Sequence, residues 1–121
     1  MTPTAAIRLG QVSAEYERMA VEYGDVAHAA AQAEADHKHA RAKAVMRYKA
    51  EQERMSQAEA ETRAEADDNI SNLYRLRLVT AAAADSHRER LRQLKEQVAV
   101  GRSFVASERA ADQIHATGGN T

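Results

Sequence analysis

Two segments of the chain place a carboxylate three residues before a histidine. Glu34 precedes His37, and Asp112 precedes His115. On a helix this spacing puts both side chains on one face, and carboxylate-bridged metal sites in bundles combine it with glutamates from facing helices. The segment expected to face His37 carries no carboxylate on its apolar stripe. We therefore expect no metal and no cofactor, and interpret His37 as a residue that fixes helix register.

Asp85, Ser86 and His87 are the residue types of a nucleophilic triad, but they are consecutive. Consecutive side chains on a helix point in different directions, so no triad geometry follows. The chain has no glycine-rich phosphate loop and no nucleophile elbow. Its lack of cysteine excludes disulfides and thiolate metal sites. We expect a protein that is not an enzyme.

Basic residues recur near one face of the second half, and they could follow a phosphate backbone. We favour flanking charges that answer the acidic N-terminal third, because no aromatic stacking platform lies between the bases. Gly101 lies beside them, and glycine inside a helix costs about 1 kcal/mol relative to alanine. We interpret it as a crossing point inside a dimer; the alternative is close approach to a different partner. The candidate contact residues for a partner or nucleic acid are Arg77, Arg88, Arg92, Lys95, Arg102 and Ser103.

The elements that carry these residues are predicted to be helices. Residues 25–100 contain neither glycine nor proline, and strong helix formers dominate them. Apolar residues in the first half recur in steps of four and three, which is typical of a coiled-coil seam. The seam shifts by one residue after Ala44 and resumes in the second half. Its predicted oligomer-contact residues are Val12, Tyr16, Met19, Tyr23, Val26, Leu91, Leu94, Val98 and Val105.

Charge segregation predicts where the chain turns. Residues 37–49 carry five bases and no acid, and residues 50–70 carry seven acids and two bases. A turn near residue 54 brings these blocks together, whereas a turn at residues 67–69 brings bases against bases. Opposite flanking charges set orientation in coiled coils. The first turn is therefore favoured.

The predicted fold is all-α: a long antiparallel, coiled-coil-like helical hairpin that dimerises into a four-helix bundle. We expect one domain, residues 1–121, with helices over about 11–51 and 56–114. A turn over about 52–56 joins them, and a flexible tail follows at 116–121. Alanine dominates the apolar residues, so one hairpin buries little and should associate with itself. Two straight helices paired between copies would make the same contacts, and this alternative stays open.

We expect a cytoplasmic protein with no membrane partner. The first residues lack a basic segment followed by an apolar run, and no apolar stretch approaches the roughly 20 residues that a membrane span needs. The net charge of −1 argues against a surface that binds nucleic acid everywhere.

The segment Leu91 to Ser103, with Val-Gly-Arg-Ser at residues 100–103, continues through Ala106 to Arg109-Ala110. It resembles the C-terminal half of small, uncharacterised helical proteins of actinobacterial tailed phages. Those relatives usually have a glycine in the turn, where this chain has Gln52 to Ser56, and often Glu where it has Ala111.

Such proteins are often encoded near phage recombination functions. The resemblance therefore implies a non-enzymatic helical adaptor that binds a protein partner in DNA recombination or replication, in the cytoplasm of the host. Two alternatives stay open. One is a direct nucleic-acid binder that uses the basic stripe, and the other is a virion assembly or scaffolding protein.

Overall fold

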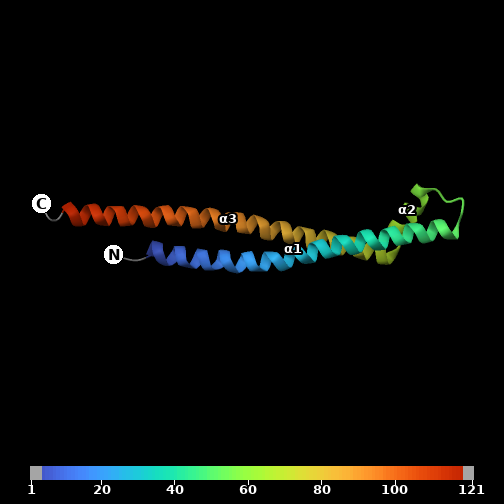
Figure 1. Ribbon diagram of the computed structural model, residues 1–121, viewed down its shortest axis with the longest axis horizontal. Helices are drawn as coiled ribbons and strands as arrows, with labels where there is room; N and C mark the ends of the chain where they lie inside the picture. The colour runs from blue at the N-terminus through green and yellow to red at the C-terminus, as the bar shows by residue number, and fades with distance from the viewer. Residues whose placement is uncertain (1–3, 119–121) are drawn as a thin grey trace. The chain divides into compact units, whose positions relative to one another are not determined.

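The regular secondary structure is all α-helix over residues 4–118, the part that the computed structural model describes (Figure 1). The helices are α1 (Thr4–Glu51), α2 (Gln57–Ala66) and α3 (Asp68–Gly118). Between residues 4 and 118 no residue belongs to a strand. The all-α prediction is confirmed, as expected for a chain rich in alanine and other strong helix formers.

The helix bounds differ from the predicted ones at both ends of the chain. Helix α1 begins at Thr4 rather than near residue 11. Its first turns are supported by contact with α3, where Leu9 meets Gly101. Helix α3 runs to Gly118, so residues 116–118 belong to the helix and not to a tail. The rest of the predicted tail, residues 119–121, lies outside the described residues.

The chain reverses between α1 and α2, within the segment predicted for the turn. Helix α1 ends at Glu51, and Ser56 forms the N-cap of α2. The Ser56 hydroxyl oxygen accepts a hydrogen bond from the Glu59 backbone N–H at 3.1 Å. This bond satisfies one of the free backbone donors at the start of a helix. The turn therefore forms without glycine, through a short segment that ends in a serine cap.

The predicted second helix over 56–114 is interrupted, and its continuity was wrongly predicted. Asp67 is extended, with φ −67° and ψ 131°, between α2 and α3. Its Oδ1 accepts from the backbone N–H groups of Asn69 at 2.9 Å and Ile70 at 3.3 Å. Asp67 is therefore the N-cap of α3. Residues 67–69 mark a break in the helix, whereas the reversal relative to α1 lies at 52–56.

The structure divides into two compact units. The first unit combines residues 1–22 with residues 87–121, and the second comprises residues 23–86. In the first unit Leu9 meets Gly101, Glu15 pairs with Arg90, and Glu22 lies against His87. The partner's number falls as the number along α1 rises. The two helical segments of this unit are therefore antiparallel.

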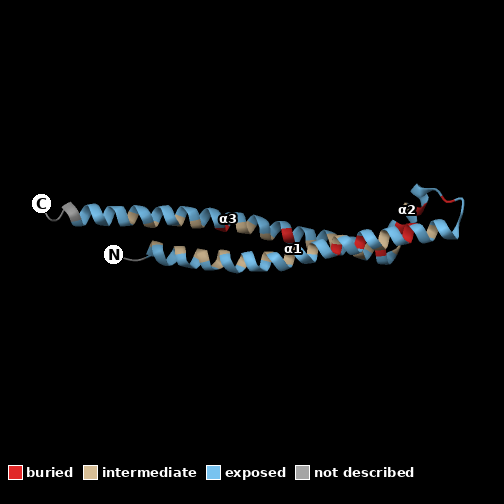
Figure 2. Cartoon of the chain, in the orientation of Figure 1, coloured by how far each residue is buried: buried red, intermediate tan, exposed pale blue. Residues whose placement is uncertain are grey.

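The second unit contains the best-packed part of the described chain. Ala44 and Val45 of α1 pack with Met55, with Ala60 and Ala64 of α2, and with Ile70 of α3. Figure 2 marks the buried residues of this unit in red. In this cluster the contact stripe of α1 moves by one residue, from Ala44 to Val45 and then Tyr48. Helix α2 packs against α1 at this point. The break at Asp67 lets α2 pack there independently of α3.

Ion pairs in the second unit join the charge blocks that the sequence suggested should meet. Arg41 pairs with Glu65 at 3.1 Å, and Arg47 pairs with Asp67 at 3.7 Å. Lys49 also donates to the Gln57 side-chain oxygen at 3.0 Å. These contacts are those expected for a turn near residue 54. None of the three helices, over the residues described, is apolar over a length that could cross a membrane.

Candidate functional site

The predicted seam residues lie in contacts made within the chain. In each unit, one stripe of α1 faces one stripe of α3, and all nine predicted seam residues are buried or half-buried. Leu94 is fully buried, at 0% exposure. Within the single chain these residues form the contact between α1 and α3, because the reversal at 52–56 lets the same chain supply the facing helix. Their assignment to a contact between copies stays a prediction.

Arg77 belongs to this seam and not to the basic stripe in which we placed it. Residues 70, 73, 77, 80, 84, 87, 91 and 94 of α3 alternate in steps of three and four, and all are buried or half-buried. Arg77 Nη1 lies 3.1 Å from His37 Nδ1, and its Nη2 donates to Glu34 Oε1 at 3.3 Å. Arg77 thus contacts α1 and is not available to a separate partner.

His37 is the buried polar residue of this seam, at 7% exposure. Its ring lies 5.2 Å from that of Tyr74. Burial, followed by the nearby Arg77 and Arg41 guanidinium groups, lowers the pKa of His37 below its usual 6.5. Neutral imidazole can accept from Arg77 where imidazolium cannot. This geometry agrees with a histidine that fixes register.

Glu34 completes the polar cluster but does not form a metal site. Lys38 donates to its carboxylate and, together with Arg77, lowers the pKa of Glu34. The Lys38–Glu34 distance is 2.8 Å. Among residues 4–118 no group of three or more histidine and carboxylate side chains is arranged to hold a metal ion. Asp112 and His115 lie exposed near the C-terminal end of α3.

Arg92 is held by acids of its own helix. Its guanidinium donates to Glu89 and, at 2.7 Å, to Glu96. The hydrogen bond from Arg92 lowers the pKa of Glu89, and the two glutamates raise that of Arg92. A phosphate or carboxylate from a partner would have to displace both glutamates. Arg92 is therefore a poorer contact candidate than the other predicted bases.

The remaining bases form one row along α3. Arg88, Lys95 and Arg102 are exposed and seven residues apart, and Arg109 continues the same spacing. Seven residues span about 10.5 Å of helix. We call these four residues the basic row. Over residues 4–118 the structure gives no ion pair to Lys95, Arg102 or Arg109.

In the first unit, no ion pair joins an acid of α1 to Lys95, Arg102 or Arg109 among the described residues. Glu15 Oε1 accepts from Arg90 at 2.8 Å, and Glu22 lies 3.7 Å from His87. Arg90 and His87 lie in other rows of α3. On the flank of α1 that corresponds to the basic row, the spacing of seven places only small residues: Ala6, Ser13 and Ala20. Lys95, Arg102 and Arg109 of this row are therefore left for a partner.

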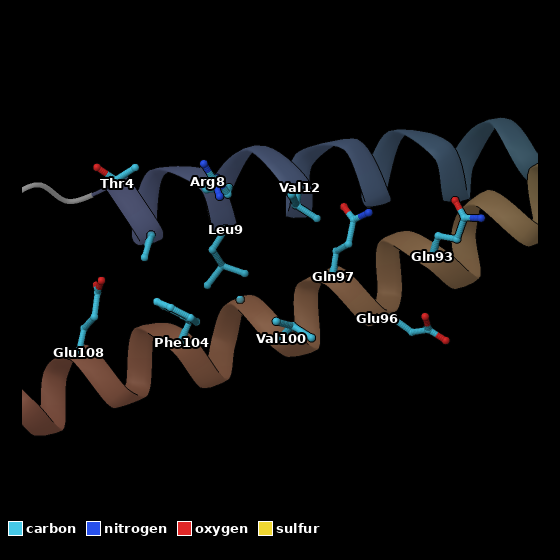
Figure 3. A pocket seen from close by; sticks show the side chains of 12 residues that line it. Thr4, Arg8, Leu9, Val12, Gln93, Glu96, Gln97, Val100, Phe104 and Glu108 are labelled. Atoms are coloured by element: carbon cyan, nitrogen blue, oxygen red, sulfur yellow. The ribbon is translucent and has the colours of Figure 1, made fainter.

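A groove lies between α1 and α3 in the first unit, with a volume of about 770 Å³. Figure 3 shows Leu9 pointing from α1 toward α3, with Val100 and Phe104 on the facing helix. Val100 and Phe104 are 64% and 62% exposed. Arg8 lines the α1 edge of the groove, and Glu108 lines the α3 edge. The groove thus combines apolar walls with opposite charges at its edges.

The sequence interpretation overlooked Arg109. It could have been found, because a spacing of seven links it to Arg88, Lys95 and Arg102. Val100 and Phe104 belong to a second set of positions, in steps of three and four, beside the first seam. Of the predicted contact residues, Arg88, Lys95, Arg102 and Ser103 share the exposed side of α3 in the first unit. Arg77 does not lie with them.

No family model, curated protein or solved structure matches this chain.

Proposed function

We propose that the protein is a non-enzymatic helical adaptor that binds an acidic helix of a partner protein through the basic row. The observation that carries the proposal is the regular placement of Lys95, Arg102 and Arg109. These cations are exposed, seven residues apart, and not paired over residues 4–118. Charges at heptad spacing beside a helical seam choose partners in coiled coils. A partner helix with an acid at every seventh residue fits this row.

The small side chains beside the row support a helical partner. Ala6, Ser13 and Ala20 occupy the neighbouring flank of α1. Small residues allow two helix backbones to approach closely, so an incoming helix can contact α1 while its acids reach the row. Exposed ion pairs contribute only about 0.2–1 kcal/mol each. The apolar contact therefore supplies affinity, and the cations supply specificity.

The resemblance to phage proteins supports a biological setting for this adaptor. In that setting the partner is a protein of DNA recombination or replication, and the adaptor acts in the cytoplasm of the phage's host. We also propose that it acts as a homo-oligomer, at least a dimer. Alanines are prominent among the buried apolar residues of the chain, so one copy buries little large apolar surface.

Direct binding of nucleic acid is the second candidate, and the same unpaired cations favour it. It is weaker because a single file of four bases neutralises few phosphates and no aromatic side chain lies between them. A role in virion assembly is a third candidate, which long helical surfaces also suit.

Quantitative affinity purification from infected cells tests the proposal. The wild type is compared with Lys95→Glu/Arg102→Glu and with the control Lys43→Glu/Arg75→Glu. The control makes the same charge change at two exposed residues outside the basic row. We expect a recombination or replication protein with the wild type and the control, and its loss with the first variant.

Three results would overturn the adaptor. Capsid or tail proteins alone would favour virion assembly. Nucleic acid alone, with binding that falls steeply as salt rises, would favour the direct binder. If Lys95→Glu/Arg102→Glu retained the protein partner in full, the basic row would not be the binding surface.

A further inference from the structure

The outer side of α3 in the first unit carries a second stripe of mainly apolar positions that remain exposed. Its members alternate in steps of three and four, and all are exposed: Gln97, Val100, Phe104, Ser107, Ala111 and Ile114. This is the spacing of a second helix-packing seam. The stripe spans about 26 Å of helix, long enough for a helix of five turns to lie along it.

Val100 and Phe104 form a ridge of this stripe between two hollows. On one side is the groove of about 770 Å³ against α1. On the other is a shallower hollow of about 350 Å³, which Ser103 and Ser107 line together with the ridge. Helices pack by fitting the ridges of one into the grooves of the other. A surface that has both can pack against a copy of itself.

We infer that this stripe pairs antiparallel with the same stripe of a second copy of the chain, related by two-fold symmetry. With Phe104 opposite Ser107 of the second copy, Val100 lies opposite its Ala111, and Ile114 lies opposite its Gln97. Each apolar large residue then meets a smaller or more flexible one, as interdigitating layers require. By symmetry, every such contact occurs twice.

Charges at the edge of the groove agree with this register. Leu9 faces Gly101 within the chain, so Arg8 lies near the level of residue 102 on α3. In the antiparallel pairing, that level coincides with residue 109 of the second copy. The partner's Glu108 is then one residue away, about 1.5 Å along the axis. Neither Arg8 nor Glu108 has an ion pair among residues 4–118.

A parallel pairing in register lacks this complementarity. It places Arg8 near the level of residue 102 of the second copy, six residues from both Glu96 and Glu108. Phe104 would also meet Phe104, leaving the hollow beside Ser107 unfilled. The antiparallel arrangement satisfies the apolar layers and the charges together.

Sedimentation equilibrium at micromolar concentration tests which face forms the dimer. We expect the wild type to be dimeric. The dimer dissociation constant of Phe104→Glu should be at least about tenfold higher. Phe104 is exposed in the single chain, so this variant should keep its helical circular dichroism. Val21→Glu is the matched control, since Val21 is an exposed apolar residue outside the stripe, and it should remain dimeric. A monomeric wild type, or a Phe104→Glu dimer as tight as the wild type, overturns the inference.

Cysteine pairs test the register, because the natural chain has no cysteine. After oxidation, Val100→Cys/Ala111→Cys should form cross-linked dimers, and Ala111→Cys alone should not. Cross-linking of the single variant would show a parallel pairing and overturn the antiparallel one.

Arg8→Glu and Glu108→Arg should each weaken the dimer, and the double variant should restore it. Lys95→Glu/Arg102→Glu should stay dimeric, so the dimer and the adaptor can fail separately.

Discussion

Arg77 Nη1 lies 3.1 Å from His37 Nδ1, although 40 residues separate the two along the chain. The same guanidinium reaches Glu34 at 3.3 Å. A polar group that finds its partner in only one alignment fixes the register of two facing helices. This contact therefore anchors α3 against α1 within the second unit.

Replacement of Arg77 by glutamate should destabilise the fold. Arg77→Glu sets a carboxylate beside Glu34 and removes the donor that His37 accepts from. We expect a loss of about 1–3 kcal/mol in the free energy of unfolding, measured by urea denaturation. Arg75→Glu is the control, because Arg75 is exposed on the same helix, and it should change stability by less than about 0.5 kcal/mol. Equal losses for both would remove the register role.

Stability should fall as His37 becomes protonated. Burial and the facing Arg77 and Arg41 lower its pKa in the folded state, against a raising effect of Glu65. The fold therefore favours neutral imidazole, and its contribution is complete above the usual pKa of 6.5. It is lost as the pH falls through 6.5 toward the lower folded-state pKa. Thermal melts between about pH 7.5 and 5.5 should show a steeper fall for wild type than for His37→Gln. Parallel curves would contradict this.

The break between α2 and α3 depends on the side chain of Asp67. Its carboxylate caps α3 by accepting from two backbone N–H groups and also pairs with Arg47. Asp67→Ala should cost about 1 kcal/mol. Asp68→Ala removes the adjacent acid from the first turn and should cost less, about 0.3–1 kcal/mol. Chemical denaturation of the two variants measures the difference in the free energy of unfolding. A larger loss for Asp68→Ala would contradict the assignment of Asp67 as the N-cap of α3.

Gly101 tests how closely α1 approaches α3 in the first unit. A Cβ added there would lie 3.0 Å from Leu9 Cδ1, whereas one added at Gly10 would meet nothing within 4 Å. Alanine at Gly10 should therefore gain most of the roughly 1 kcal/mol of helix propensity. Gly101→Ala should gain less, because Leu9 has to shift. Gly101→Leu should lose about 1–3 kcal/mol through overpacking. Equal gains from both alanine variants would argue against this contact.

The fold was predictable where one physical signal dominated. The steps of four and three from Val12 to Ala44 identified the stripe of α1 that faces other helices. Opposite charge blocks then located the reversal near residue 54. The interruption at Asp67 could not be read in the same way, because Ala60 and Ala64 look like any helical alanines. Only their packing against Ala44 and Val45 shows why α2 is separate.

The candidate site was predictable only in part. Arg77 was misplaced because an apolar pattern does not predict a half-buried base within the seam, and its role depends on His37 and Glu34 of the facing helix. Arg92 was predicted as a partner contact, but in the structure it pairs with Glu89 and Glu96 of its own helix. The unpaired state of Lys95 and Arg102 depends on α1 offering small residues beside them. Identifying these unpaired cations required knowing which residues of α1 lie beside α3, and the two segments are far apart in the sequence.

Lysine footprinting of the protein, bound to the acidic helical partner that we propose, tests the adaptor proposal most directly. Lys95 lies in the basic row, whereas Lys43 is an exposed lysine outside it. An amine-reactive probe should modify both residues in the isolated protein. In the complex, the account predicts strong protection of Lys95 and unchanged modification of Lys43, as read by mass spectrometry. Unchanged modification of Lys95 in a complex that has formed would contradict it.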